Sequence, residues 1–267
     1  MYSKQFIRNQ LEEMNIAPGV PIIMHTALRA VGDVEGRAEG LLEVVRDYVV
    51  ERGGLLLVPT HTWTNLETNE EFALDMTKNQ TCIGTFSNVA LTVKGGVRTK
   101  NPSHSVVIFG KEDVVKEYVD LENKQITPTS PNGCYGKVFV DDGYVLLVGV
   151  GQEKNTCLHC VEEMLKLPNR LSDEPIDMKI KMRDGSVSVK KFHYMRSDVI
   201  KDVSVFFPKY EIAFRTHGAI TDGKLGNAKI QLCSAKKIQE VMELIYKRSG
   251  GEEILKDATP LKEDWYK

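Results

Sequence analysis

One short segment of the sequence holds most of the residues that could do chemistry. It runs from Gly149 to Glu163 and combines glycines with a histidine, carboxylates, thiols and a threonine. His159 and Glu162 stand three residues apart, so on a helix they share a face and can form a hydrogen bond. A carboxylate so placed holds the tautomer of the imidazole and stabilises its charged form, which lets the histidine accept a proton from an amine. The spacing therefore favours a general base carried by a helix.

Other interpretations of the same residues stay open at this level. His159 could be a hydrogen-bonded helix residue with Glu162 as its solvated neighbour. Cys157, His159, Cys160 and Glu162 also offer metal ligands, but structural zinc usually needs a second ligand pair, and the sequence has no second Cys-x-x-Cys. A redox role for Cys157 and Cys160 is less favoured because thioredoxin-like surroundings are missing. We therefore expect no metal site.

A buried strand is expected to place this helix. Tyr144–Val150 is almost entirely apolar, which is typical of a strand covered on both faces. A glycine-rich loop follows, with Asn155 or Thr156 as the expected N-cap of a helix over Leu158–Leu165. Open α/β sheets bind ligands at such junctions, outside the carboxyl ends of strands.

A second candidate segment follows the first expected strand, Val20–Met24, and precedes an amphipathic helix over Ala38–Glu51. Backbone N–H groups in such a strand-to-helix loop can bind an anion such as pyrophosphate, and Arg29 could assist. No Walker or Gly-x-Gly-x-x-Gly pattern is present, so an ordinary turn fits equally well.

Two further polar segments flank expected strands. Val58–Asn65 follows the strand Leu55–Pro59 and could form a wall for a hydroxylated substrate, or simply a well-packed loop. Its candidate contacts with a substrate are Thr60, His61, Thr62 and Trp63. Arg98–Ser105 precedes the strand Ser105–Phe109 and gathers hydroxyls, a histidine and a cation, although a solvated strand entry fits it too.

The whole chain indicates a layered α/β protein. Its 267 residues are 42% hydrophobic, and apolar strands alternate with amphipathic helices. The expected fold is α/β, a layered α/β/α arrangement with a central mixed sheet, in one domain over residues 1–267. A polar hairpin over Pro175–Lys190, turning at Asp184–Gly185, predicts a small appended lobe at about 170–195. The last expected helix is Ala235–Tyr246, followed by a polar tail.

Composition excludes several partners. The formal net charge of −2 comes from interspersed charges, so neither nucleic-acid nor membrane-surface binding is expected. No stretch approaches the roughly 20 apolar residues of a membrane span. The five cysteines are an odd number at irregular spacing, which favours free thiols and a cytoplasmic location.

Taken in order, these segments resemble the aminoglycoside 3-N-acetyltransferase family, including its uncharacterised bacterial members. The resemblance spans most of the chain. It rests on motifs at His25–Gly32, Pro59–Thr62, Pro102–Ser105, Thr127–Pro128, Ser130–Lys137, Leu146–Val150, Asn155–Glu162 and Gly226–Ala228.

The resemblance implies acetyl-coenzyme A as co-substrate, no metal, and direct acetyl transfer to an amine without an acyl-enzyme. His159 would be the general base with Glu162 behind it, and Thr156 would help to align the reacting groups. Glu163 joins the loop residues as a candidate substrate contact. The expected cofactor-binding residues are His25, Thr26, Leu28, Arg29, Ala30, Val31, Ser103, Ser105, Gly226, Asn227 and Ala228.

The partner expected on these grounds is a small-molecule amine, with an aminoglycoside as one candidate. Asn101 and Cys160 depart from the pattern of the resistance enzymes, so another amine or amino sugar stays open as acceptor. A non-catalytic coenzyme A-binding protein is the alternative from a different class. A homodimer is slightly favoured over a monomer.

Overall fold

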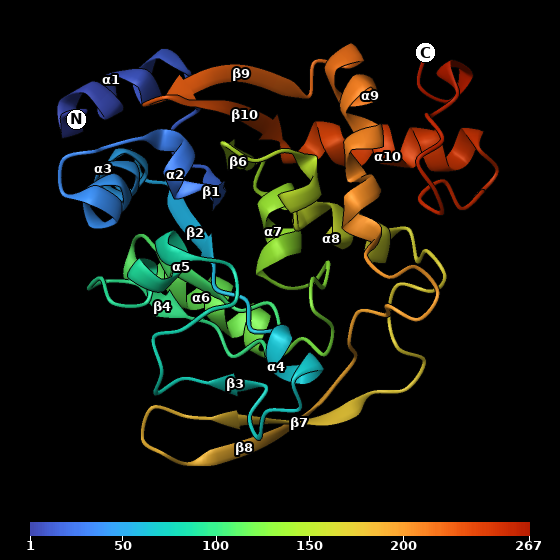
Figure 1. Cartoon of the computed structure of the whole chain (residues 1–267), viewed down its shortest axis with the longest axis horizontal. Coiled ribbons are helices and arrows are strands. Elements are labelled where there is room, and N and C mark those ends of the chain that lie inside the picture. Colours follow the sequence, from blue (N-terminus) through green and yellow to red (C-terminus); the bar gives the residue numbers. More distant parts are fainter.

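A seven-stranded mixed sheet forms the centre of the computed structural model, which describes residues 1–267 (Figure 1). The strand order is β4-β5-β2-β1-β6-β10-β9. Strand β1 is parallel to both β2 and β6, and the remaining pairings in this sheet are antiparallel. The strands are β1 (Pro21–Thr26), β2 (Leu55–Pro59), β4 (Val97–Arg98), β5 (Val106–Phe109), β6 (Tyr144–Val148), β9 (Ile220–Leu225) and β10 (Ala228–Ser234).

Helices cover both faces of this sheet and complete the expected α/β/α layers. One face packs against α1 (Lys4–Glu13), α3 (Arg37–Val50) and α5 (Thr85–Ala90). The other packs against α6 (Glu112–Asn123), α7 (Cys134–Val140), α8 (Cys157–Met164), α9 (Glu211–Thr216) and α10 (Ala235–Arg248). Short turns of helix complete the chain: α2 (Leu28–Val31), α4 (Thr64–Glu67), η1 (Gln152–Lys154), η2 (Val203–Tyr210) and η3 (Glu263–Trp265).

Alternation along β1 separates the two cores and aims the next polar residues. Ile22 and Met24 belong to the core on the α3 side, whereas Ile23 belongs to the core on the α8 side. Because successive strand side chains point to opposite faces, His25 continues toward the α8 side and Thr26 toward the α3 side. The carboxyl end of β1 thus presents a histidine to the layer that carries His159.

The hairpin expected over Pro175–Lys190 is confirmed as β7 (Ile176–Lys181) and β8 (Val187–Phe192). It forms a separate sheet with β3 (Leu74–Asp75), a strand that the sequence did not indicate. Figure 1 shows this small sheet at one end of the molecule, beyond α4. Phe192 and Met178 are buried there against Ala73, so the lobe has its own small core.

Several elements differ from the sequence-based expectation. Strands β9 and β10, the second edge of the central sheet, were not predicted, because Ile220–Leu225 is polar and mostly exposed. The C-terminal tail is not merely a polar extension: Leu255, Leu261 and Tyr266 are buried in the α8-side core. None of the helices has both the length and the apolar character that crossing a membrane requires.

A truncation in the central strand tests the packing. Leu147 on β6 is fully buried, so Leu147→Ala should lower the free energy of unfolding by about 2–5 kcal/mol. Val189 on β8 is 60% exposed, and Val189→Ala should change it by less than about 1 kcal/mol. Urea denaturation measures both values. Equal losses in the two variants would show that β6 is not the centre of the core.

Candidate active site

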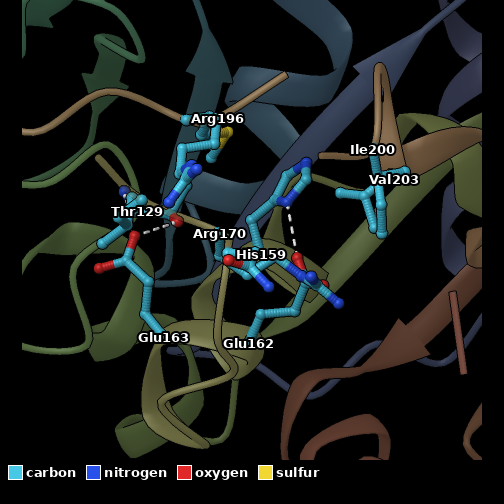
Figure 2. Close-up of a pocket in the computed structure, with 11 residues that line it drawn as sticks. Thr129, His159, Glu162, Glu163, Arg170, Arg196, Ile200 and Val203 are labelled. Carbon is cyan, nitrogen blue, oxygen red and sulfur yellow. Dashed lines mark hydrogen bonds and ion pairs between the residues drawn. The ribbon is translucent and has the colours of Figure 1, made fainter. Parts of the chain in front are cut away.

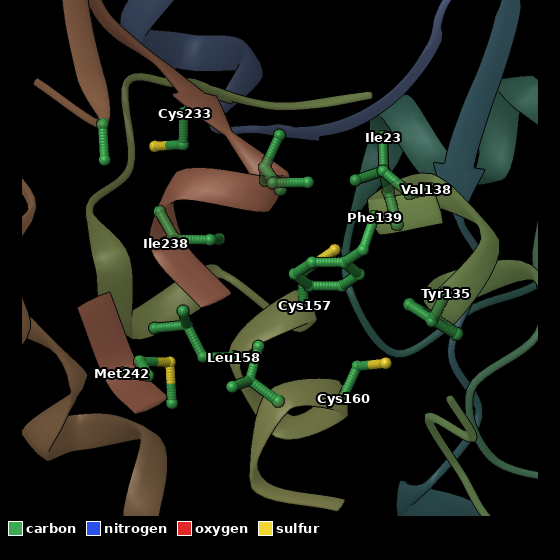
Figure 3. Packing of buried hydrophobic residues seen from close by; sticks show 14 of the residues in the cluster. Ile23, Tyr135, Val138, Phe139, Cys157, Leu158, Cys160, Cys233, Ile238 and Met242 are labelled. Atoms are coloured by element: carbon green, nitrogen blue, oxygen red, sulfur yellow. The ribbon is translucent and has the colours of Figure 1, made fainter. Parts of the chain in front are cut away.

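Helix α8 has one face in the core and one face in the candidate site. Cys157, Leu158, Cys160 and Val161 are fully buried in the α8-side core, where they lie near residues of α7 and α10 (Figure 3). The side chain of His159 keeps 15% of its surface exposed. This division fixes the helix by packing while it leaves the imidazole accessible.

A chain of four charged or polar groups runs behind His159 (Figure 2). His159 Nδ1 lies 2.9 Å from Glu162 Oε2. Arg170 Nε donates to the other carboxylate oxygen of Glu162, and the Arg170 Nη1 and Nη2 atoms contact Glu253 at 2.8 and 2.9 Å. Glu162 is only 1% exposed, so its interpretation as a solvated neighbour is wrong. No protein group bonds His159 Nε2, which stays free for a substrate.

Glu163, the next residue, is held by hydroxyl and amide donors from the segment before α7. Its carboxylate accepts hydrogen bonds from Thr127 Oγ1 at 2.6 Å, from Thr129 Oγ1 at 2.6 Å and from Thr129 N at 3.0 Å. Burial raises the pKa of Glu163, and these three hydrogen bonds act in the opposite direction. The residue lines the same pocket as His159.

The pocket around His159 has an apolar side. Leu171, Met195, Ile200 and Val203 line it opposite the carboxylates. The ring of Phe207 meets the His159 imidazole edge to face, with ring centres 4.8 Å apart. These contacts fix the imidazole plane and exclude water from one side of it.

Three more histidines gather at the strand ends beside His159. His25 follows from β1, while His61 and His104 have ring centres 4.4 Å apart. Burial lowers the pKa of His25 and of His104 to about 3 each, and that of His61 well below its usual value. All three are therefore neutral at physiological pH. Tyr135 OH contacts His61 Nε2 at 3.1 Å and donates to the His104 carbonyl at 3.0 Å.

Unpaired polar atoms mark the crevice between β1 and β6. His25 Nε2, Thr26 Oγ1 and Asn155 Oδ1 are buried and have no hydrogen-bond partner within the protein. Such atoms are rare in folded proteins and call for a partner from outside the chain. The parallel strands β2-β1-β6 meet here with their helices on opposite faces, which is the usual ligand position in an open α/β sheet.

The expected cap of α8 differs from the structure. Thr156 occupies the N-cap position, but its side chain makes no capping bond, and Asn155 Nδ2 instead donates to Gln152 Oε1 at 2.9 Å. Helix η1 supplies the backbone continuity that a cap would otherwise provide. The hydroxyl of Thr156 is consequently uncommitted, one turn before His159.

Two of the three predicted cofactor segments lie together. Helix α2, which carries Leu28, Arg29, Ala30 and Val31, packs against β6 and β10. The β9–β10 turn reaches it through Asn227 N, which donates to the Val31 carbonyl at 2.9 Å. Gly226 has φ +58°, and a Cβ there would lie 2.3 Å from the same carbonyl, so this turn needs glycine. Ala228 is buried beside them.

The third predicted segment lies two strands away. Ser103 and Ser105 precede β5 and are 2% and 0% exposed. Ser103 Oγ contacts His104 Nδ1 at 2.9 Å, and Ser105 Oγ donates to the Thr60 carbonyl at 2.8 Å. Their hydroxyls are thus engaged within the protein, and their contact with a cofactor stays a prediction.

The predicted substrate wall divides in the same way. Thr60, His61 and Thr62 are buried, and Thr62 Oγ1 donates to the Pro102 carbonyl at 3.0 Å. Trp63 is 38% exposed at the start of α4, so it is not a buried anchor of the loop. No three His, Cys, Asp or Glu side chains in the structure are placed to share one metal ion.

Sequence reasoning missed the residues that support the site from a distance. Arg170 and Glu253 carry no motif, although an arginine eight residues after a buried glutamate is a signal that could have been used. Thr129 and Phe207 gave none, because their roles come from tertiary contacts alone.

Comparison with known proteins agrees with this geometry. The family model described as aminoglycoside 3-N-acetyltransferase matches residues 23–247. The chain belongs to the aminoglycoside 3-N-acetyltransferase family. This is an acyltransferase family, and the match includes every predicted catalytic and cofactor residue of the chain.

Individual relatives in the family are distant. Aminoglycoside N(3)-acetyltransferase IV of Salmonella sp. is 28% identical over 167 residues, 62% of this chain and 61% of that protein, which is less than two thirds of its length. The acetyltransferase-like protein YokD of Bacillus subtilis (strain 168) is 21% identical over 95% of this chain and 96% of its own. The structure of AAC-IIIb with CoASH has a TM-score of 0.74 at 19% identity, covering 89% of this chain and 93% of that one. These structural likenesses show the shared fold.

The pH dependence of stability tests the burial of Glu163. Its folded-state pKa is raised, so its contribution to stability is full below its unfolded-state pKa and is lost as pH rises through the folded-state value. Between about pH 4 and about pH 7, the wild type should lose stability relative to Glu163→Gln, which cannot titrate there. Urea unfolding of both proteins across this range measures the difference. Parallel curves, or a relative gain, would contradict the burial of this carboxylate.

Proposed function

We propose that this protein transfers the acetyl group of acetyl-coenzyme A to a small-molecule amine, with His159 as general base. The observation that carries the proposal is the buried contact between His159 Nδ1 and Glu162 Oε2. It favours the imidazole tautomer with its proton on Nδ1, so the lone pair of Nε2 faces the pocket. Family membership supplies the reaction class.

The reaction follows from that tautomer. The amine nitrogen attacks the thioester carbonyl carbon, and His159 Nε2 takes the proton that the nitrogen loses. The C–S bond then breaks, and the imidazolium returns its proton to the leaving thiolate. Glu162 stabilises the imidazolium between these steps, and Arg170 keeps the carboxylate ionised and oriented. Thr156, with its free hydroxyl one turn earlier, is placed to align the reacting groups.

The co-substrate fits the crevice between β1 and β6. The unpaired buried atoms of His25, Thr26 and Asn155 offer hydrogen bonds to a polar chain such as the pantetheine arm. At the outer end, α2 and the Gly226–Ala228 turn offer backbone N–H groups, and Arg29 is exposed without an ion pair, as a phosphate-binding end requires. The structure of a fold relative bears CoASH in its title, which supports the same assignment.

The acceptor is an amine, and an aminoglycoside is the first candidate. Titles of other fold relatives name a gentamicin, sisomicin and apramycin as their ligands. In this chain, Glu163 stands beside His159 with its carboxylate held by Thr127 and Thr129, ready to receive a second ammonium group. We therefore propose Glu163 as an acceptor contact.

Replacement of the base tests the proposal. His159→Ala should lower turnover of acetyl-coenzyme A by about 10²–10⁴-fold, because the proton of the attacking amine loses its acceptor. The dissociation constant of coenzyme A should stay within about twofold, since the imidazole binds the proton rather than the cofactor. Release of free thiol with a panel of aminoglycosides and other amino sugars measures the first quantity, and calorimetry measures the second.

The matched control is His217→Ala, which removes an exposed histidine at the end of α9 and should leave turnover unchanged. Full activity in His159→Ala, or loss of coenzyme A binding as its main defect, would contradict the base role. Cofactor binding without turnover of any amine by the wild type would point instead to a protein that senses coenzyme A.

A further inference from the structure

A wide groove lies at the opposite end of the sheet from the cofactor segments. It has a volume of about 690 Å³ and runs between the loop after α5, the end of α6 and the β7–β8 turn. Figure 1 shows β4 and that turn on the same side of the molecule, away from α2 and α8. The groove shares none of its lining residues with the pocket around His159.

A buried arginine forms part of the groove wall. Arg98 is only 4% exposed, and its guanidinium donates solely to uncharged oxygens: Nη2 to the Thr60 carbonyl at 2.9 Å and Nε to Ser105 Oγ at 3.2 Å. No carboxylate lies within 4.0 Å of it, and Nη1 has no protein partner. Asp75, whose charge acts on Arg98 from farther away, is bonded to Thr77.

A buried cation without a counter-ion is costly, and proteins normally pair it. Burial is the main cause that lowers the pKa of Arg98 to about 10, and the positive charge of Arg183 acts in the same direction. Arg98 still carries its charge at neutral pH. The missing counter-ion has one route of access, which is the groove.

The remaining charges of the groove have the same sign. Lys94, Lys100 and Arg183 line it, are exposed, and form no ion pair. The one acidic residue in the wall, Asp184, is engaged by the N–H and hydroxyl of Ser186 at 2.9 and 2.6 Å. Four cations therefore face one hollow against a single carboxylate that is already hydrogen-bonded.

We propose that this groove binds a small molecule bearing a phosphate or pyrophosphate group, with Arg98 as the fixed cation and Lys94 and Arg183 closing over the anion. A guanidinium held by two neutral acceptors presents its remaining N–H groups in a fixed direction, which suits the tetrahedral oxygens of phosphate. The mobile lysine and arginine heads add attraction that salt screens. The site lies beside Thr60 and Ser105, so its occupancy is in contact with the loops that lead to His61 and His104.

Titration of inorganic pyrophosphate into the full-length protein tests this site. Saturating coenzyme A is present throughout, so that the proposed cofactor segments near α2 are already occupied. Pyrophosphate should still bind, and Lys94→Gln/Arg183→Gln should weaken its dissociation constant by at least about tenfold, since each lost charge-assisted hydrogen bond is worth about that factor. Affinity for coenzyme A itself should not change in this variant.

The matched control is Lys224→Gln/Lys237→Gln, which removes the same number of positive charges from β9 and the start of α10. It should bind pyrophosphate like the wild type. A third variant, Arg98→Lys, keeps the charge but not the fixed fork, and should also bind about tenfold more weakly. If that variant does not fold, the surface pair still decides the question.

Three results would overturn the proposal. They are no binding of pyrophosphate once coenzyme A saturates the protein, equal affinity in Lys94→Gln/Arg183→Gln and the wild type, and equal weakening in the charge control. The measurement needs no acceptor amine and no turnover. Its failure is therefore distinct from failure of the proposed acetyl transfer.

Discussion

The buried carboxylate of Glu162 is the constraint on which the site depends. With 1% of its surface exposed, it is stable as an anion only because Arg170 and His159 each occupy one of its oxygens. That requirement ties together three parts of the chain, because Arg170 is in turn held by Glu253 from beyond α10. The C-terminal tail, which buries Leu255 and Tyr266 in the α8-side core, is thus part of the support of the catalytic helix.

The sheet supplies the second half of the site. Parallel strands β1 and β6 end at the same edge, and the residues that follow them bring His25, Thr26 and Asn155 toward His159. Their polar groups are neutral and unpaired, while the charges are held behind them by ion pairs. A crevice of this kind can accept a neutral amide-bearing chain and still keep a proton acceptor dry, which strengthens the electrostatic effect of Glu162 on the imidazole.

Much of the fold could be predicted because its signals are local. The apolar runs of β1, β2 and β6 and the periodic helices α1, α3 and α10 appear directly in the sequence, and so does the turn at Asp184–Gly185. Strand β9 could not be predicted, since its exposed edge resembles a polar loop, and β3 has only two residues. The His159–Glu162 contact was predictable from helical spacing, and the structure confirms it. The burial of Glu162 was not, because it depends on Arg170 and Glu253, whose positions are set by tertiary packing. Side-chain capping by Asn155 or Thr156 failed for a related reason: η1 takes over the start of α8.

The tautomer of His159 tests the account most directly. Nitrogen-15 NMR of the imidazole near neutral pH, with His159→Ala used to assign the signals, should show the neutral ring protonated on Nδ1 and unprotonated on Nε2. Glu162→Gln should remove that preference, because the amide cannot hold the Nδ1 proton as a carboxylate does. A wild-type ring protonated on Nε2, or one indifferent to Glu162→Gln, would contradict the claim that a buried carboxylate prepares His159 to act as a base.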